Sequence, residues 1–262
     1  MIVGNEGDEI VLYGDFEANQ DTYTLIDEVP MLFSQVSEGD VSLYFNPDTA
    51  LTIHETDGGV SQYGIGTDDL LTGTANSETL SGRTGSAQLD AGAGADRQLG
   101  GEGNDALSYD QQDIEFDGGV GVDMVLISGE VNLNGVDNLA NIEILDLSND
   151  TADTLGLNLS DVYGIVGDNS LNGYVMGNDN KVLVINGDAQ DSVLLDGLDI
   201  EFITPDASDV DVFGNGERYY LFQDDGVDLY VHGDLVDSNT SLAGKDLDSY
   251  IHDKPVDSFG VS

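Results

Sequence analysis

The sequence predicts an all-β protein in which a short parallel β-roll is continued by further strands, as a β-solenoid or a sandwich-like module. The first observation is a nine-residue repeat that stays in phase from Gly64 to Leu126. The second is the apolar residue at position eight of the repeat, which a flexible Gly/Asp-rich linker would have no reason to keep. The third is that the other apolar segments are short, rich in Val, Ile, Leu and Tyr, and bounded by Gly, Asp or Asn.

The elements beyond the short strands of the repeat follow from this composition. The expected strands are Ile10–Tyr13, Val41–Phe45, Met124–Ser128, Ile142–Leu147, Val182–Asn186, Ser192–Leu195, Arg218–Gln223 and Val227–His232. At most one short helix is expected, over Leu159–Val166, where Ser160 is a candidate N-cap.

The repeat has glycines, an acidic residue and an apolar residue at fixed positions. Its seven copies read GIGTDDLLT, GTANSETLS, GRTGSAQLD, AGAGADRQL, GGEGNDALS, YDQQDIEFD and GGVGVDMVL. The fifth and seventh copies match G-G-x-G-x-D-x-U-x at every specified position, where U is a large apolar residue. This pattern is typical of calcium-binding nonapeptide repeats. Glycine at positions one, two and four lets the backbone adopt a positive φ, which a side chain would penalise.

Successive turns of such a repeat fall on opposite edges, so each turn stacks on the turn two repeats away. The first row of turns contains residues 64–69, 82–87, 100–105 and 118–123, and the second row contains 73–78, 91–96 and 109–114. Calcium takes about six to eight oxygen ligands, which the carboxylates and backbone carbonyls of two stacked turns can supply. Asp105 and Asp123 lie two repeats apart in intact glycine-rich turns, and they are the strongest predicted pair.

The remaining turns match the pattern less well. Glu78 and Asp96 are also two repeats apart, but the turn of Glu78 is a poor match, so they predict a partial site. Ala87 and Ile114 replace the acidic residue at position six of two other turns. Gln98 interrupts the apolar row at position eight.

The chain is strongly acidic, with 52 Asp and Glu against 6 Lys and Arg and a formal net charge of −46. Such a field would repel nucleic acid and anionic membrane surfaces, so neither is an expected partner. Two carboxylates about 5 Å apart repel by roughly 3 kcal/mol at an effective dielectric constant near 20. We therefore expect the chain to stay expanded until divalent cations or high salt neutralise it. An acidic surface also suits proteins from salty habitats, and charge alone does not separate these explanations.

The chain contains no cysteine, which excludes disulfides and thiolate chemistry. No segment approaches the roughly 20 apolar residues of a membrane helix, so membrane insertion is not expected. The segment MIVGNEGDEI lacks the basic and apolar regions of a signal peptide. Any export signal is therefore expected elsewhere in the protein.

A longer repeat divides the rest of the chain. GNEGDEIVLYG and EGDVSLYFN near the N-terminus parallel GDAQDSVLLDG and DGVDLYVHG, which begin at Gly187 and Asp225. We therefore expect a chain that begins within a repeat and forms a piece of a protein built from tandem modules. The predicted divisions are a partial β module over 1–63, the β-roll over 64–126, a C-terminal β module over 127–235 and a tail over 236–262.

The nonamers are followed by FDGGVGVDMVLISG, NLANIEILDLSN, LNLSDVYGIVG and VLVINGDAQDSVLLDG. Residues 64–235, with the N-terminal piece as a partial second copy, resemble the C-terminal region of giant RTX adhesins, which are bacterial surface proteins exported by type I secretion. The resemblance implies an extracellular, cell-surface location, calcium-dependent folding and an uncleaved secretion signal at the extreme C-terminus. The acidic tail over 236–262 resembles such a signal.

The resemblance also implies a set of calcium ligands. Asp105 and Asp123 match the family's acidic ligands, and Glu78, Asp96 and Asp69 are weaker matches. The matching turn residues are Gly100, Gly101, Gly103, Asn104, Gly118, Gly119 and Gly121. The departures at Ala87, Gln98 and Ile114 argue against a long regular row of ions.

No catalytic motif is present, so we expect a protein that is not an enzyme. The three histidines, His54, His232 and His252, show no metal-ligand spacing, and no G-x-S-x-G, P-loop or S-x-x-K motif occurs. The sequence thus favours a non-catalytic module of a surface adhesin that folds on binding calcium after export. The alternatives are the calcium-binding tail of a secreted RTX enzyme, a module that binds a surface glycan or peptide, and a module that pairs with neighbouring modules in a filament or lattice.

Overall fold

The computed structural model describes part of the chain, and every statement below concerns that part. The described residues are 9–13, 17–26, 29–38, 41–45, 50–55, 58–167, 181–196, 201–202, 219–224, 227–235, 241–242 and 245–246. The chain divides into two compact units, Met1–Asp123 and Met124–Ser262. Both are built mainly from β-strands, as the sequence predicts. The described part of the chain contains one α-helix and a short helical turn at 233–235.

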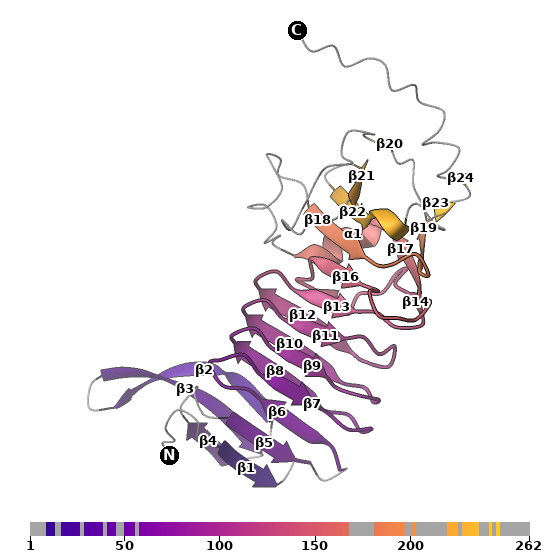
Figure 1. The fold of residues 1–262 in the computed structure, drawn as a ribbon. Coiled ribbons are helices and arrows are strands. Elements are labelled where there is room, and N and C mark those ends of the chain that lie inside the picture. Colours follow the sequence, from indigo (N-terminus) through magenta and orange to yellow (C-terminus); the bar gives the residue numbers. More distant parts are fainter. Residues whose placement is uncertain are drawn as a thin grey trace. The chain divides into compact units, whose positions relative to one another are not determined.

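The first unit contains two sheets of stacked parallel strands (Figure 1). One sheet has the order β1 (Glu9–Tyr13), β5 (Ala50–His54), β6 (Val60–Tyr63), β8 (Thr79–Thr84), β10 (Arg97–Glu102) and β12 (Glu115–Val120). The other contains β7 (Leu70–Thr72), β9 (Gln88–Asp90) and β11 (Ala106–Ser108). Within the first sheet only β5 and β6 pair antiparallel. A separate antiparallel sheet is formed by β2 (Glu17–Ile26), β3 (Val29–Glu38) and β4 (Val41–Phe45).

The strand registers in the repeat reproduce the predicted spacing of two nonamers. In one sheet, Arg97 of β10 lies between Thr79 of β8 and Glu115 of β12, each two nonamers away. In the other, Leu71 of β7 pairs with Leu89 of β9 at the same offset. A nine-residue repeat that alternates between two sheets returns to the same sheet every second copy, which gives this register.

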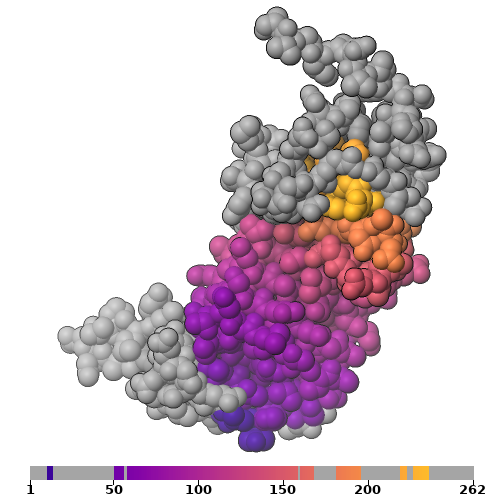
Figure 2. Space-filling model, in the orientation of Figure 1, coloured from indigo at the N-terminus to yellow at the C-terminus, as the bar shows by residue number. Residues whose placement is uncertain are grey.

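The core of the first unit lies between its two sheets and consists mainly of the position-eight side chains. Those at positions 71, 80, 89, 107 and 116 are buried, and Gln98 is buried with them. Burying one leucine or phenylalanine stabilises the fold by about 1.5–3 kcal/mol, so this row is a major source of stability. In Figure 2 the atoms of the repeat are coloured from purple to magenta.

The N-terminal strands belong to the same unit as the repeat. β1 pairs with β5, and β6 pairs in parallel with β8 at the offset of two nonamers that continues through the repeat. β1, β5 and β6 thus extend the sheet of the repeat, whereas β2, β3 and β4 form their separate sheet. The unit ends at Asp123, shortly before the predicted end of the β-roll at Leu126.

The second unit also contains stacked parallel strands, with longer connections, and the last strands of each group below pair antiparallel. One group follows the order β13 (Met124–Leu126), β16 (Ile144–Asp146), β18 (Lys181–Asn186), β22 (Val227–His232), β21 (Tyr219–Asp224) and β20 (Glu201–Phe202). The other follows β14 (Glu130–Asn132), β17 (Thr154–Asn158), β19 (Ser192–Asp196), β23 (Ser241–Leu242) and β24 (Lys245–Asp246). A short strand, β15, spans Leu139–Ala140. Glu130 pairs with Thr154, and Thr154 pairs with Ser192, so successive offsets differ and both exceed two nonamers.

The single described α-helix, α1, spans Leu159–Val166, as predicted. Its N-cap is Asn158 and not the predicted Ser160, because Asn158 has an extended backbone and its side chain accepts a hydrogen bond from the Ser160 N–H. Asparagine is as good an N-cap as serine, so residue type alone did not decide between them. None of the described helices is long and apolar enough to cross a membrane.

The expected strands beyond the repeat are present, with ends that differ slightly from those predicted. The sequence did not predict the long antiparallel pair of β2 and β3 or the short strands β5, β6, β14, β15 and β17. Most of the predicted tail, residues 236–262, lies outside the described residues, as do parts of the proposed longer repeat.

Candidate metal site

The acidic residues at position six point into the stack of turns. Asp105 and Asp123, the strongest predicted pair, are 2% and 0% exposed. Asp96 and Glu78 of the second row are 0% and 4% exposed, whereas Asp69 is only partly buried. Four carboxylates are therefore removed from water, which requires that each be hydrogen-bonded, protonated or paired with a cation.

In the first row, one oxygen of each buried carboxylate binds the backbone of the preceding stacked turn. The Asp105 N–H donates to Asp123 Oδ1 at 2.8 Å, and the Ala87 N–H donates to Asp105 Oδ1 at 2.6 Å. Both bonds join residues two nonamers apart. The structure thus brings Asp105 and Asp123 together in stacked turns, and each carboxylate ties two turns to each other.

The second oxygen of Asp105 has a different environment. Asp105 Oδ2 is buried and has no hydrogen-bond partner. A side chain at Gly100 would overlap both Asp105 Oδ2 and the Gly118 carbonyl oxygen, so these two oxygens flank the same small space. Burial raises the pKa of Asp105, and the hydrogen bond from the Ala87 N–H lowers it again only in part. An unsatisfied buried polar atom costs about 1–3 kcal/mol, and more when it is charged.

The turns that begin at Gly64 and Gly73 show the same close approach at position one. A side chain at Gly64 would overlap Asp69 Oδ2 and approach the Gly82 carbonyl, and one at Gly73 would overlap Glu78 Oε2 and the Ala91 carbonyl. The glycine at position one therefore leaves room beside a carboxylate oxygen of its own turn and a carbonyl oxygen of the next stacked turn.

The predicted turn glycines are required by close stacking. Gly119 has a φ of 94°, and a Cβ there would overlap the Gly101 carbonyl oxygen. Gly121 would likewise overlap the Gly103 carbonyl oxygen. Any side chain at these positions would push adjacent turns apart.

Asn104, one of the predicted turn residues, lies on the outer side of its turn. It is exposed, its N–H donates to Ser86 Oγ at 3.3 Å, and its Oδ1 accepts from the Val122 N–H at 2.9 Å. The Ser86 N–H donates in turn to Asp68 Oδ1 at 2.8 Å. These position-five residues form an outer series of hydrogen bonds that joins the turns on their exposed side.

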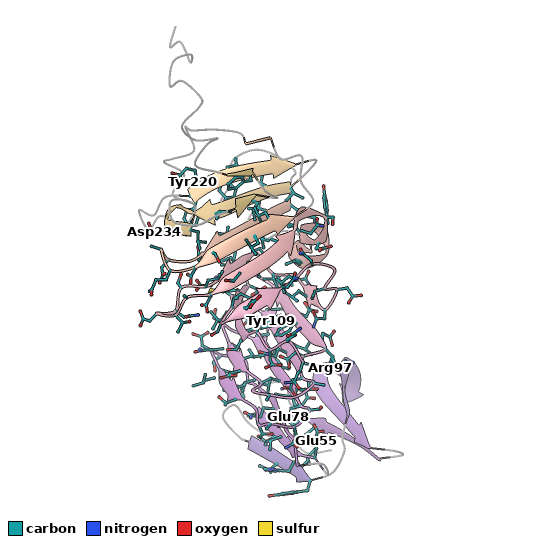
Figure 3. The ribbon with its side chains drawn as sticks, turned by 90° about the vertical axis from the view of Figure 1, so that its right-hand side faces the viewer. Glu55, Glu78, Arg97, Tyr109, Tyr220 and Asp234 are labelled. Atoms are coloured by element: carbon teal, nitrogen blue, oxygen red, sulfur yellow. The ribbon has the colours of Figure 1, made fainter. Side chains whose placement is uncertain are left out.

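The second row carries an unbroken carboxylate series of Glu78, Asp96 and Asp113. Figure 3 labels Glu78 and Tyr109, which lie in the first and the last of its turns. The Val60 N–H donates to Glu78 Oε1 at 3.1 Å, and the Glu78 N–H donates to Asp96 Oδ1 at 2.7 Å. The Asp96 N–H donates to Asp113 Oδ1 at 3.2 Å. Glu78 Oε2 accepts the Thr74 N–H at 2.8 Å, so both oxygens of Glu78 are hydrogen-bonded.

Asp113 is a residue that the repeat pattern missed. It stands at position five, immediately before Ile114, yet it is 4% exposed while Ile114 is exposed. The turn over 109–114 lacks glycine and shifts its register by one position, so that Asp113 takes the inward place of the missing acidic residue. The sequence offered one indication of this role, because Asp113 stands next to Ile114, which replaces the acidic residue at position six.

Near Ala87, which lacks a carboxylate, the positive charge of Arg83 lies close to Asp69 of the stacked turn. Asp69 Oδ2 accepts the Ile65 N–H at 2.8 Å. Burial raises the pKa of Asp69, and this hydrogen bond and the nearby positive charge of Arg83 lower it again only in part. Arg83 donates from Nη1 to the Gly64 carbonyl at 3.3 Å. Its guanidinium also lies 5.8 Å from the centre of the Tyr63 ring, within cation–π range. Arg83 adopts a φ of 67° at a glycine position of the repeat, an uncommon conformation for its residue type.

A second aspartate series lies in the C-terminal unit, outside the nonamers. The Gly129 N–H donates to Asp153 Oδ1 at 2.6 Å, and the Asp153 N–H donates to Asp191 Oδ1 at 2.9 Å. The remaining oxygens accept from Asn149 Nδ2 and from the Asp188 N–H. All four oxygens of these buried aspartates are therefore hydrogen-bonded, unlike those of Asp105. The sequence did not predict this series, because its sequence offsets of 24 and 38 follow no regular period.

In the part of the chain that the structure describes, no three His, Cys, Asp or Glu side chains gather as a metal-binding group. A cation in these turns would therefore have at most two carboxylate residues and would take its other oxygens from backbone carbonyls or amides. No family model, curated protein or solved structure matches this chain.

Proposed function

We propose that this chain is a non-catalytic, calcium-stabilised module of a secreted bacterial surface protein of the RTX adhesin type. Its repeat region, in this proposal, is a parallel β-roll that folds when calcium binds after export. The observation on which the proposal rests is Asp105 Oδ2, a buried carboxylate oxygen without a hydrogen-bond partner that shares a small space with the Gly118 carbonyl.

The donor set suits calcium. Calcium prefers hard oxygen ligands from carboxylates and backbone carbonyls, in a flexible geometry. Asp105, Asp123 and the carbonyl groups of the glycine-rich turns would hold the ion, with Asp96 contributing in the second row. A divalent cation offsets both the desolvation of a buried carboxylate and the repulsion between stacked carboxylates.

This chemistry also fits a protein that must cross a membrane before it folds. Extracellular calcium modules have dissociation constants of about 10⁻⁴–10⁻³ M, so such sites stay empty at the low free calcium of a cytosol. Binding free energy at sites that exist only in the folded state is folding free energy. The net charge of −46 would then keep the chain extended until calcium is available.

Calcium titration calorimetry on the whole chain tests the proposal, with Asp105→Asn and Asp153→Asn as a matched pair. Both substitutions replace a buried aspartate in a stacked series by its amide. Asp105→Asn removes charge from an oxygen that has no hydrogen-bond partner, so we expect calcium affinity to fall by about tenfold or more.

Asp153→Asn should lower thermal stability equally with and without calcium, because its hydrogen-bonded oxygens need no ion. Absence of calcium binding by the unmodified chain at millimolar concentrations would refute the proposal. Equal calcium affinities for the two variants would refute the assignment of Asp105.

A further inference from the structure

Gln98 interrupts the apolar row of the repeat, yet it is fully buried. Its Nε2 donates to the Ser108 carbonyl at 2.8 Å and to Asp113 Oδ2 at 2.9 Å. Its Oε1 is buried and has no hydrogen-bond partner. A leucine at this place would avoid the burial of an unsatisfied amide oxygen, so packing alone gives no reason for glutamine.

A second unpartnered oxygen belongs to Asp96, next but one in the chain. Asp96 Oδ2 is buried without a hydrogen-bond partner, while Asp96 Oδ1 accepts from the Glu78 N–H. In extended backbone, alternate residues point to the same side. Asp96 and Gln98 therefore both direct a hard oxygen into the interior of the stack.

Asp113 joins these two residues. One of its oxygens accepts from the Asp96 N–H and the other from Gln98 Nε2. Two buried carboxyl groups and a buried amide oxygen are therefore gathered in a place removed from water.

We propose that Asp96, Gln98 and Asp113 hold a divalent oxygen-binding cation, of the calcium class, in the second row of turns. This inference rests on the proposed function, because it takes the same cation, but it adds to the predicted Asp96 two residues, Gln98 and Asp113, that the repeat pattern does not predict. The two carboxylates supply charge, and the Gln98 amide supplies a neutral oxygen from strand β10. Carboxylate and amide oxygens are both normal calcium ligands.

The site differs from the first-row site in the source of its ligands. The first-row residues Asp105 and Asp123 stand at position six of intact turns. Here Asp113 comes from position five and Gln98 from position eight, the position that otherwise supplies the apolar core. The two departures from the repeat pattern, Ile114 at position six and Gln98 at position eight, therefore belong to the same proposed site.

Substitutions at Gln98 test whether this residue binds the cation or only donates structural hydrogen bonds. Gln98→Met removes the amide at similar length, and Gln98→Glu keeps an oxygen but cannot donate the two hydrogen bonds. If Gln98 is a calcium ligand, the Gln98→Glu variant should bind calcium at least as tightly as the unmodified chain. The Gln98→Met variant should then bind one ion fewer by calorimetry. If Gln98 acts only as a hydrogen-bond donor, both variants keep the ion count and Gln98→Glu is the less stable one, which would overturn the inference.

Terbium luminescence gives an independent readout, since terbium occupies calcium sites and is excited through nearby tyrosine. Tyr109 lies in the same turn as Asp113, stacked on Phe116 with ring centres 5.3 Å apart. We expect Tyr109→Phe and Gln98→Met to remove the same fraction of the terbium emission. Unchanged emission in both variants would contradict the site.

Asp105→Asn is the control that distinguishes the two proposals. If the unmodified chain binds no calcium, the proposed function fails and this site fails with it. If the chain binds calcium and Asp105→Asn weakens binding, but Gln98→Met leaves the ion count unchanged, only the second-row site fails.

Discussion

In two of the inward carboxylates of this protein, the two oxygens of one side chain have different environments. In Asp96 and Asp105, one oxygen accepts a backbone N–H from the preceding stacked turn, and the other has no hydrogen-bond partner. The first oxygen holds the turns in register whether or not a cation is present. Burial of the second oxygen is unfavourable unless a cation or a proton neutralises the carboxylate.

The pKa values of the buried carboxyls predict how the stability of the chain depends on pH when calcium is chelated. Burial raises the pKa of Asp105 and Asp96 and brings that of Asp113 to about 7, whereas unfolded carboxyls titrate near 4. Between about pH 4 and 7 the folded chain therefore binds more protons than the unfolded chain, so the free energy of unfolding falls as pH rises. Thermal unfolding in chelator across this range measures the slope.

Excess calcium should reverse that pH dependence, because protons compete with the cation for the same carboxylates. Asp113→Asn should flatten the upper part of the chelator curve near pH 7, where Asp113 titrates. A melting temperature in chelator that rises from pH 4 to pH 7 would contradict the assignment of raised pKa values to these buried groups.

Arg83 and Ala87 stand together where the repeat would have glycine and aspartate. Ala87 leaves the turn without a carboxylate, and Arg83 brings a positive charge to the Gly64 carbonyl and to Asp69. The guanidinium thus supplies a positive charge near Asp69, although burial still raises the pKa of that carboxyl. We predict that the double variant Arg83→Gly/Ala87→Asp binds one more calcium ion than the unmodified chain by calorimetry.

The single variants provide the controls for this prediction. Ala87→Asp alone should gain little calcium binding, because Arg83 competes for the new carboxylate. Arg83→Gly alone should leave the ion count unchanged and remove the positive-φ strain, which is about 1 kcal/mol for a residue with a side chain. A double variant with an unchanged ion count would show that the guanidinium does not substitute for an ion.

At the scale of elements, the stack depends on how closely its turns approach one another. The strands β7, β9 and β11 are very short, so few hydrogen bonds hold each strand in place. The turns make up for this with carboxylate bonds on the inner side and position-five bonds on the outer side. Glycine is needed where the backbone of one turn meets a carbonyl of the next.

Gly119→Ala and Gly129→Ala test this close approach. Their φ values are similar, 94° and 82°, but a Cβ at Gly119 would overlap the Gly101 carbonyl while a Cβ at Gly129 meets nothing within 4 Å. Both variants suffer the positive-φ strain of about 1 kcal/mol. Gly119→Ala should lose about 2 kcal/mol more in calcium-saturated denaturant unfolding. Equal losses would show that backbone conformation, and not contact between turns, requires glycine in the repeat.

At the scale of the whole molecule, the dominant property is the net charge of −46. Repulsion among so many carboxylates opposes any compact state, and general screening and specific binding relieve it differently. At about 1 M salt the screening length is about 3 Å, which weakens interactions between exposed charges. Buried carboxylates such as Asp105 are screened much less.

Calcium removal should therefore expand the chain in a way that salt does not fully reverse. We expect chelation to reduce the β-structure signal in circular dichroism and to increase the radius of gyration in X-ray scattering. Molar sodium chloride should restore compactness only in part, and millimolar calcium should restore both signals. Full recovery in sodium chloride alone would favour a general salt adaptation over specific calcium sites.

Much of the first unit followed from the sequence because its contacts are periodic. A nine-residue repeat determines the pairing of Arg97 with Glu115 and the inward direction of Leu89, since each depends only on counting along the chain. The pairing of Asp105 with Asp123 follows in the same way. The hairpin of β2 and β3 was not predicted, since it has no comparable repeat and its composition is mixed.

The sequence by itself determined the strand class, the register of two nonamers, the apolar row and the stacked acidic pair, because a strict period converts spacing into position. Only the tertiary structure decided that Asp113 moves inward in place of Ile114, that Gln98 Oε1 and Asp96 Oδ2 are buried without partners, and that Asp153 and Asp191 form a hydrogen-bonded series. The physical reason is that these features depend on which atoms of neighbouring coils meet. Where a turn shifts its register by one position, or where coil lengths vary as they do in the second unit, no spacing in the chain encodes that meeting.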